Sequence, residues 1–197
     1  CLGDAGIFSF NGNKVLTTGS GGALLLNSKK LYTRANLLAK QGKNSLEYKY
    51  KYSGFNYKMS NLNASLGYPQ IKLFKILLKK KIAIAKFYDL AFKTNYRFFL
   101  MPRNNKVKSS CWLYSLKMHS KKDAKSLISF LKKRKIESRL FWENLSSQKP
   151  YMNYLLISKK VSNDLSKKIV SLPCSTNLTK EDQKTVIQET LTWANRN

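Results

Sequence analysis

Residues that bind metals or form disulfides are scarce in this sequence. The 197 residues include one histidine, His119, and three cysteines, Cys1, Cys111 and Cys174, an odd number at wide spacing. No CxxC pair is present, so the sequence argues against a zinc site and against a disulfide framework. Such cysteine usage fits a reducing compartment, and we expect a cytoplasmic protein without a metal centre.

Long apolar runs are also absent. No stretch reaches the roughly 18 apolar residues that a membrane-spanning helix needs. The first apolar stretch is interrupted by Gly3, Asp4 and Gly6, so the pattern of a secretory signal is missing. The chain starts with Cys1 rather than Met, and we expect a fragment or a processed chain.

Acidic residues are few, since 10 Asp and Glu stand against 37 Lys and Arg and give a formal net charge of +27. A non-catalytic basic module that binds polyanions such as nucleic acid is therefore one function to consider. Lysine far outnumbers arginine, however, whereas base-reading sites favour arginine. No block of five or more like charges occurs either. The pattern weighs against nucleic-acid binding and is compatible with an anionic small substrate.

The periodicity of apolar residues predicts two units, and the 43% of hydrophobic residues suffices for a packed core. The elements expected in the first unit, residues 1–95, are a buried strand over 5–10, extended pieces over 15–27, a helix over 29–39 capped by Ser28, a loop over 43–61, a small helix capped by Ser60 or Asn61 and a long helix that Pro69 begins. Those expected in the second unit, residues 96–197, are strands over 96–101, 111–118 and 137–142, helices over 121–135 and 162–169, an extended piece over 170–176 and a last helix over 180–195 with Thr179 as its cap.

One lysine, Lys14, lies between an expected strand end and a glycine-rich turn, in the stretch FSFNGNKVLTTGSGG. A lysine fixed by a tight turn suits Schiff-base chemistry, and pyridoxal phosphate also needs hydroxyl and backbone N–H groups for its phosphate. Ser9, five residues earlier, offers such a hydroxyl. The alternative is that Lys14 is one of many solvated lysines and that the glycines form a hairpin turn. The pattern alone leaves both interpretations open.

Two long motifs resemble the DegT/StrS-type sugar-nucleotide aminotransferases, which are fold-type I enzymes that use pyridoxal phosphate. They are GDAGIFSFNGNKVLTTGSGGALLLNS and, about forty residues after Lys14, GFNYKMSNLNASLGYPQIKLF. The later segments SRLFWENLSSQKPY and SLPCSTNLTKEDQ also resemble the family, in the same order. The resemblance implies an α/β fold, with the tail of the large cofactor-binding domain over 1–95 and a small α+β domain over 96–197.

By position in these motifs, the resemblance implies roles for four residues. Lys14 would bind pyridoxal phosphate as a Schiff base and move a proton between the sugar carbon and the cofactor. Ser9 would bind the cofactor phosphate, and Asn56 would reach that phosphate from the neighbouring subunit of a homodimer. Arg139 would lie near the sugar nucleotide, or else be a surface arginine packed on Trp142.

The sequence also departs from the family pattern. Ser20 stands where the family usually has glutamate, Lys58 where it has arginine, and Ser146 where many members have histidine. The family's first half is missing, with the aspartate that keeps the cofactor's pyridine nitrogen protonated. We therefore expect the isolated fragment to be inactive.

The resemblance implies an aminotransferase that converts a nucleotide-linked keto-sugar into an amino sugar for surface polysaccharide, with glutamate as amino donor. The tyrosine-rich loop around Tyr48 to Tyr57 is then expected at a homodimer interface, although its alternation with lysine also fits stacking of nucleic-acid bases. The polyanion-binding module remains the alternative.

Overall fold

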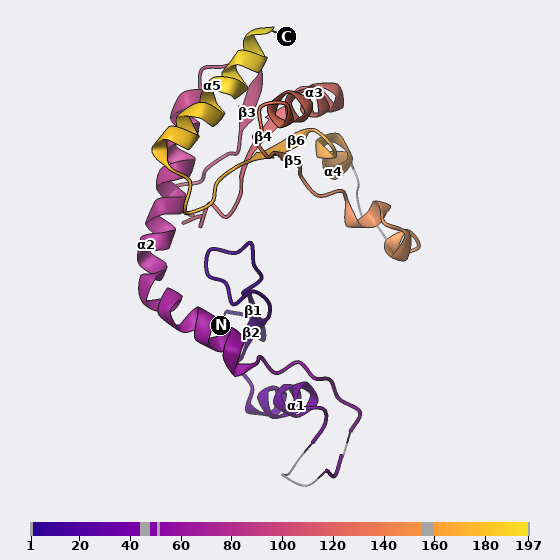
Figure 1. Cartoon of the computed structure of the whole chain (residues 1–197). Coiled ribbons are helices and arrows are strands. Elements are labelled where there is room, and N and C mark those ends of the chain that lie inside the picture. The colour runs from indigo at the N-terminus through magenta and orange to yellow at the C-terminus, as the bar shows by residue number, and fades with distance from the viewer. Residues whose placement is uncertain (1, 44–47, 51, 155–159, 197) are drawn as a thin grey trace. The chain divides into compact units, whose positions relative to one another are not determined.

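The computed structural model describes residues 2–43, 48–50, 52–154 and 160–196 (Figure 1). Cys1, parts of the predicted loop over 43–61 and residues 155–159 lie outside the described residues. Contacts divide the chain into two compact units, Cys1–Leu77 and Leu78–Asn197.

The first unit begins with two antiparallel strands, β1 (Ala5–Ser9) and β2 (Gly22–Leu26), in which Ile7 lies opposite Leu24. Helix α1 (Lys29–Ala39) follows, and Ser28 Oγ accepts a hydrogen bond from the Leu31 amide at 3.4 Å. This confirms the strand near residue 5 and the helix cap. The strand is exposed rather than buried, and of the extended pieces predicted over 15–27 only β2 is a strand.

Helix α2 (Asn61–Phe92) is continuous, with Pro69 inside it. The prediction that Pro69 begins a separate helix is therefore wrong. Proline removes one backbone donor, but Gln70 Nε2 donates to the Leu66 carbonyl at 2.7 Å and ties the helix together beside it.

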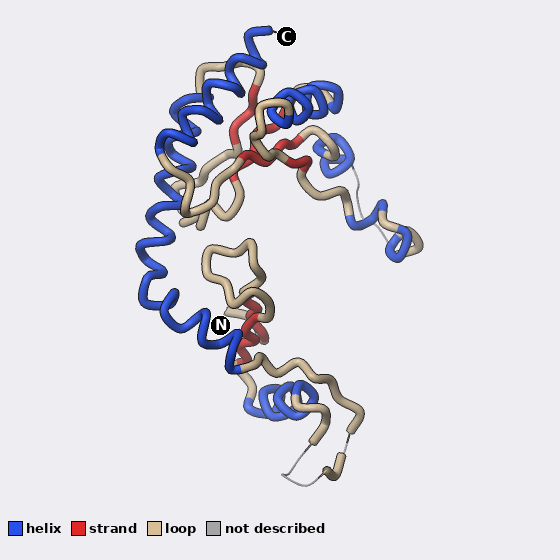
Figure 2. The backbone as a smooth tube through the Cα atoms, in the orientation of Figure 1, coloured by secondary structure: helices blue, strands red, loops and turns tan. Residues whose placement is uncertain are grey.

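The second unit contains an antiparallel sheet with the strand order β3-β4-β6-β5 (Figure 2). Its elements are β3 (Phe98–Leu100), β4 (Tyr114–Met118), α3 (Lys121–Lys132), β5 (Arg139–Leu140), α4 (Lys160–Leu165), β6 (Ile169–Leu172) and α5 (Lys180–Arg196), with 3₁₀ turns at Leu145–Ser147 and Lys149–Tyr151. The predicted order and type of these elements are confirmed, while each strand is shorter than predicted. Helix α4 ends before the predicted position because Ile169 already begins β6.

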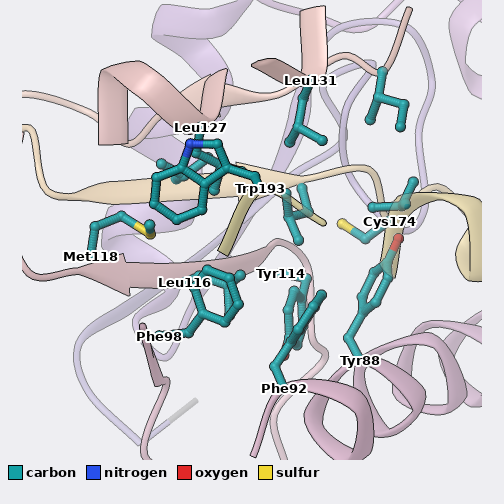
Figure 3. Close-up of a cluster of buried hydrophobic side chains, with 14 of the residues drawn as sticks. Tyr88, Phe92, Phe98, Tyr114, Leu116, Met118, Leu127, Leu131, Cys174 and Trp193 are labelled. Atoms are coloured by element: carbon teal, nitrogen blue, oxygen red, sulfur yellow. The ribbon is translucent and has the colours of Figure 1, made fainter. Parts of the chain in front are cut away.

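The hydrophobic core of the second unit is built around aromatic side chains (Figure 3). Trp193 of α5 is 1% exposed, its ring stacks on Phe98, and its Nε1 donates to Ser126 Oγ at 3.0 Å. The second half of α2 adds Tyr88 and Phe92, which are fully buried. The boundary between the two units therefore falls inside α2, after Leu77. The assignment of domains to 1–95 and 96–197 stays a prediction.

Helix α3 begins with a capping box. Ser120 Oγ accepts from the Asp123 amide at 3.0 Å, and the Asp123 carboxylate accepts from the Ser120 amide at 3.1 Å. Ser120→Ala is therefore expected to lower the free energy of unfolding by about 1 kcal/mol. Chemical denaturation measures this change, with Lys122→Ala in the same exposed first turn as the control. Equal effects of both substitutions would contradict the assigned cap.

Within the part of the chain that the structure describes, no helix combines the length and apolar character that crossing a bilayer requires. The same described residues contain no group of three histidine, cysteine or acidic side chains that could hold a metal ion.

Candidate active site

Hydrogen bonds among residues 11–14 close the turn that ends at Lys14. The Lys14 amide donates to the Asn11 carbonyl at 3.0 Å, and Asn11 Oδ1 accepts from the Gly12 amide at 2.9 Å. Asparagine favours such a turn because its side chain bonds the backbone next to it. Lys14 thus follows a tight turn shortly after the end of β1, where the sequence pattern predicts it, and it is half-buried.

The chain then returns to β1 and fixes the turn. The Phe10 carbonyl accepts from the Thr18 amide at 2.9 Å and from Thr17 Oγ1 at 3.0 Å, and the Phe10 amide donates to the Gly21 carbonyl at 3.0 Å. These bonds make residues 10–21 a closed loop between two paired strands. The glycine turn does close a hairpin, as the simpler interpretation has it, and the same loop holds Lys14.

Ser9 lies at the end of β1, at the entrance of this loop. Its Oγ accepts from the Asn11 amide at 3.3 Å, which uses an oxygen lone pair and leaves the O–H able to donate. The side chain is exposed. Ser9 and Lys14 therefore lie on one strand-to-turn connection, and the Ser9 hydroxyl is exposed.

Two residues that the sequence interpretation missed position this loop from α2. Gln70 Oε1 accepts from the Thr17 amide at 3.1 Å, and its Nε2 donates to the Thr17 carbonyl at 2.7 Å. Asn63 Nδ2 donates to the carbonyl of Thr18 at 2.7 Å. The side-chain amides of Asn63 and Gln70 are seven residues apart, so they share one face of the helix. This spacing is the sequence signal that could have indicated a common role.

Two glycines, one on α2 and one in the loop, lie at close contacts around the loop. A Cβ at Gly67 would lie 2.7 Å from Thr18 Cγ2, and Thr18 is buried. Gly21 has a φ of 93°, and its Cβ would lie 2.8 Å from Met59 Cε. Gly67 thus lets α2 approach Thr18 closely, and Gly21 adopts a backbone conformation that favours glycine.

Asn56 lies on a different segment, the loop that packs against the C-terminal end of α1. It forms an isolated β-bridge with Lys40, and the amides beside it, Phe55 and Tyr57, donate to α1 carbonyls at 2.7 and 3.0 Å. The Phe55 and Tyr57 rings stack at 4.9 Å. The bridge and these bonds hold Asn56 beside α1, and its side chain is exposed.

Arg139 lies on β5 of the second unit. Its Nε donates to Glu137 Oε1 at 2.9 Å, and its side chain is 79% exposed. Trp142, the alternative partner, packs its ring against Phe141 and Trp112 at 4.7 and 5.4 Å. The guanidinium is exposed and pairs with Glu137 through Nε and Nη2.

Comparison with known proteins supports the family resemblance. The family model described as the DegT/DnrJ/EryC1/StrS aminotransferase family matches residues 1–191. A UDP-4-amino-4,6-dideoxy-N-acetyl-beta-L-altrosamine transaminase from Helicobacter pylori is 30% identical over 193 residues, which cover 95% of this chain and 52% of the relative.

Solved structures show the same fold. Helicobacter pylori PseC, an aminotransferase involved in the biosynthesis of pseudoaminic acid, matches with a TM-score of 0.88 and 28% identity, over 98% of this chain and 54% of its own. Spr1654 from Streptococcus pneumoniae, solved in its PLP form, matches with a TM-score of 0.88 and 23% identity, over 98% of this chain and 52% of its own. The chain spans about half the length of the curated relatives it matches.

Proposed function

The chain belongs to the DegT/DnrJ/EryC1/StrS aminotransferase family, and from this premise we propose that it supplies the lysine-bearing part of a pyridoxal-phosphate-dependent sugar aminotransferase. The observation that carries the proposal is the closed loop that places the Ser9 hydroxyl and Lys14 on one strand-to-turn connection. We call the chain combined with the rest of the family fold the assembled enzyme.

The residues of this loop fit the cofactor. Pyridoxal phosphate, when bound, supplies an electron sink for removal of a proton from the substrate carbon. Ser9 Oγ–H would donate to a phosphate oxygen, and the half-buried Lys14 amine would hold the cofactor and would serve as general base at the substrate carbon. Gln70 and Asn63 keep the loop in place by bonding the backbone of Thr17 and Thr18.

The substrate is, on this proposal, a nucleotide-linked keto-sugar, with glutamate as the amino donor and an amino sugar for surface glycan as the product. The support is that a relative of this chain is a transaminase for a UDP-linked amino sugar. The excess of positive charge also favours an anionic nucleotide. Arg139 contacts the nucleotide sugar in this proposal, and the enzyme works in the cytoplasm.

Asn56 is proposed to complete the phosphate site of a second subunit in a homodimer. Mixing Lys14→Ala and Asn56→Ala subunits of the assembled enzyme is then expected to restore activity, because some mixed dimers hold one intact site. The measurement is transamination after subunit exchange, which a mass-tagged subunit verifies. If subunits exchange and activity never returns, Asn56 does not act across the interface.

The second candidate, a basic module that binds polyanions, rests on the net charge of +27. The dependence of binding on salt concentration distinguishes the two functions. Polyanion binding through many lysines weakens steeply as salt rises, whereas covalent attachment of pyridoxal phosphate does not depend on counterion release. Salt-insensitive attachment together with conversion of a keto-sugar nucleotide supports the aminotransferase. Salt-sensitive DNA or RNA binding without cofactor attachment supports the basic module.

A further inference from the structure

One buried lysine of the second unit lies against a thiol. Lys81 is 6% exposed, and its Nζ lies 3.2 Å from the Sγ atom of Cys174, which is 9% exposed. The same Nζ donates to the carbonyls of Trp112 and Cys174 at 2.7 and 2.5 Å. Among the described residues no carboxylate forms an ion pair with Lys81. Lysine is almost never fully buried unless it is paired, so this amine–thiol contact is unusual.

The surrounding core fixes the contact. Lys81 and Tyr88 are seven residues apart on α2 and share one face, and Tyr88 Oη donates to the Pro173 carbonyl at 2.8 Å. Burial raises the pKa of the Tyr88 hydroxyl above its ordinary value, so this donor keeps its proton. Cys174 and Tyr88 lie in the same part of the core (Figure 3). Two side chains that are 93 residues apart in the sequence are therefore held together inside one unit.

The other described cysteine provides a contrast. Cys111 is 8% exposed, and Arg103 Nη1 donates to its Sγ at 3.3 Å. A guanidinium stays protonated in proteins and has no lone pair to attack sulfur, whereas a lysine amine that loses its proton is a nucleophile. Both thiols are buried to the same extent beside a basic side chain. Of these two thiols, Cys174 is the one whose basic neighbour can form a bond to sulfur.

We propose that Cys174 and Lys81 are a site of oxidative modification, at which hydrogen peroxide joins the two side chains as a sulfenamide. The thiolate sulfur attacks a peroxide oxygen, the O–O bond breaks, and a sulfenic acid and water result. The lone pair of the Lys81 amine then attacks that sulfur, the S–O bond breaks, and the hydroxyl leaves as water with a proton from the nitrogen. One thiol, one amine and one peroxide thus give one sulfenamide and two waters, and the two electrons that sulfur loses reduce the peroxide.

The S–N bond would join α2 to the segment after β6. The flexible stem of lysine allows Nζ to move from its contact with Sγ to bonding distance. A link between residues 93 positions apart restricts the unfolded chain, so the oxidised protein is expected to resist urea better than the reduced protein. The site belongs to the second unit, whereas Ser9 and Lys14 belong to the first, so this inference does not rest on the proposed aminotransferase activity.

The test uses the full chain, hydrogen peroxide and no pyridoxal phosphate. After peroxide treatment the protein is denatured, its free thiols are alkylated, and its tryptic peptides are analysed by mass spectrometry. The expected product is a linked pair of peptides that contains Lys81 and Cys174 and is lighter than the two peptides together by about 2 Da, because two hydrogens are lost. Dithiothreitol is expected to separate the pair and to return the urea midpoint to that of the untreated protein.

Three variants assign the link to this contact. Lys81→Arg keeps the positive charge and the donors but supplies no nucleophile, so the link is expected to vanish and dimedone to label Cys174 as a sulfenic acid. Lys80→Arg, at the exposed neighbouring position, is the matched control and is expected to leave the link unchanged. Cys111→Ser is also expected to leave it unchanged. Circular dichroism verifies that each variant folds.

Several results would overturn the proposal. In the first, Cys174 of the unmodified chain stays reduced while peroxide oxidises Cys111. In the second, Cys174 accumulates as a sulfenic or sulfinic acid without any link to Lys81. A link from Cys174 to a different lysine, or a link that retains an oxygen atom, would equally contradict the S–N bond.

Discussion

Lys14→Ala is expected to reduce transamination by the assembled enzyme about 10³-fold or more, because the substitution removes both the amine that holds the cofactor and the base that moves the proton. The backbone of the loop should survive, since its closing bonds run between main-chain atoms of Phe10, Asn11, Thr18 and Gly21 and through the side chain of Thr17. Loss of activity with an unchanged loop would therefore report chemistry rather than folding. The measurement is the rate of amino-sugar formation, with circular dichroism as the check on folding.

Lys29→Ala and Lys30→Ala are the matched controls for Lys14. Both lysines lie in the exposed first turn of α1 and have the same side chain in the same unit. We expect their rates to stay within about twofold of the unmodified enzyme. A Lys14→Ala enzyme that retains its activity would show that another residue performs the chemistry.

Trp193→Ala is expected to destabilise the second unit by about 3–5 kcal/mol. The side chain is 1% exposed, so its removal leaves a cavity beside Phe98 and also leaves Ser126 Oγ without the indole N–H at 3.0 Å. This loss is a large fraction of the stability of an ordinary domain, and much of the protein would unfold at moderate urea concentrations. Urea denaturation followed by circular dichroism measures the change.

Trp142→Ala is the control for that substitution, because Trp142 is 59% exposed and its ring packs against Trp112 and Phe141. A change of about 1 kcal/mol or less is expected there. If both tryptophan variants lose the same stability, the core assigned to the second unit is misplaced.

Local signals made several elements of this fold predictable from sequence. Ser28 before an amphipathic stretch predicts α1, and Thr179 with Asp182 three residues later predicts the start of α5, where the Asp182 amide donates to Thr179 Oγ1 at 3.0 Å. Ser9 and Lys14 could be placed together because a strand end and a tight turn separate them by few residues. In each case the residues that determine the structure are only a few positions apart in the sequence.

Features that depend on distant contacts were not predictable in the same way. Pro69 remains inside α2 because Gln70 bonds both Leu66 and the distant Thr17. The strand near Ile7 was predicted to be buried from its apolar character, yet Ile7 is 81% exposed, because burial depends on which distant segments pack on a strand. The roles of Asn63 and Gln70 depend on how α2 meets the loop, which spacing along the helix alone does not determine.

The most direct test is to locate the lysine that binds the cofactor. The assembled enzyme is incubated with a stoichiometric amount of pyridoxal phosphate, reduced with borohydride, digested and analysed by mass spectrometry. Among the lysines of this chain, the modification is expected at Lys14 alone. Modification spread over many exposed lysines, or concentrated at another lysine while Lys14 stays unmodified, would contradict the account.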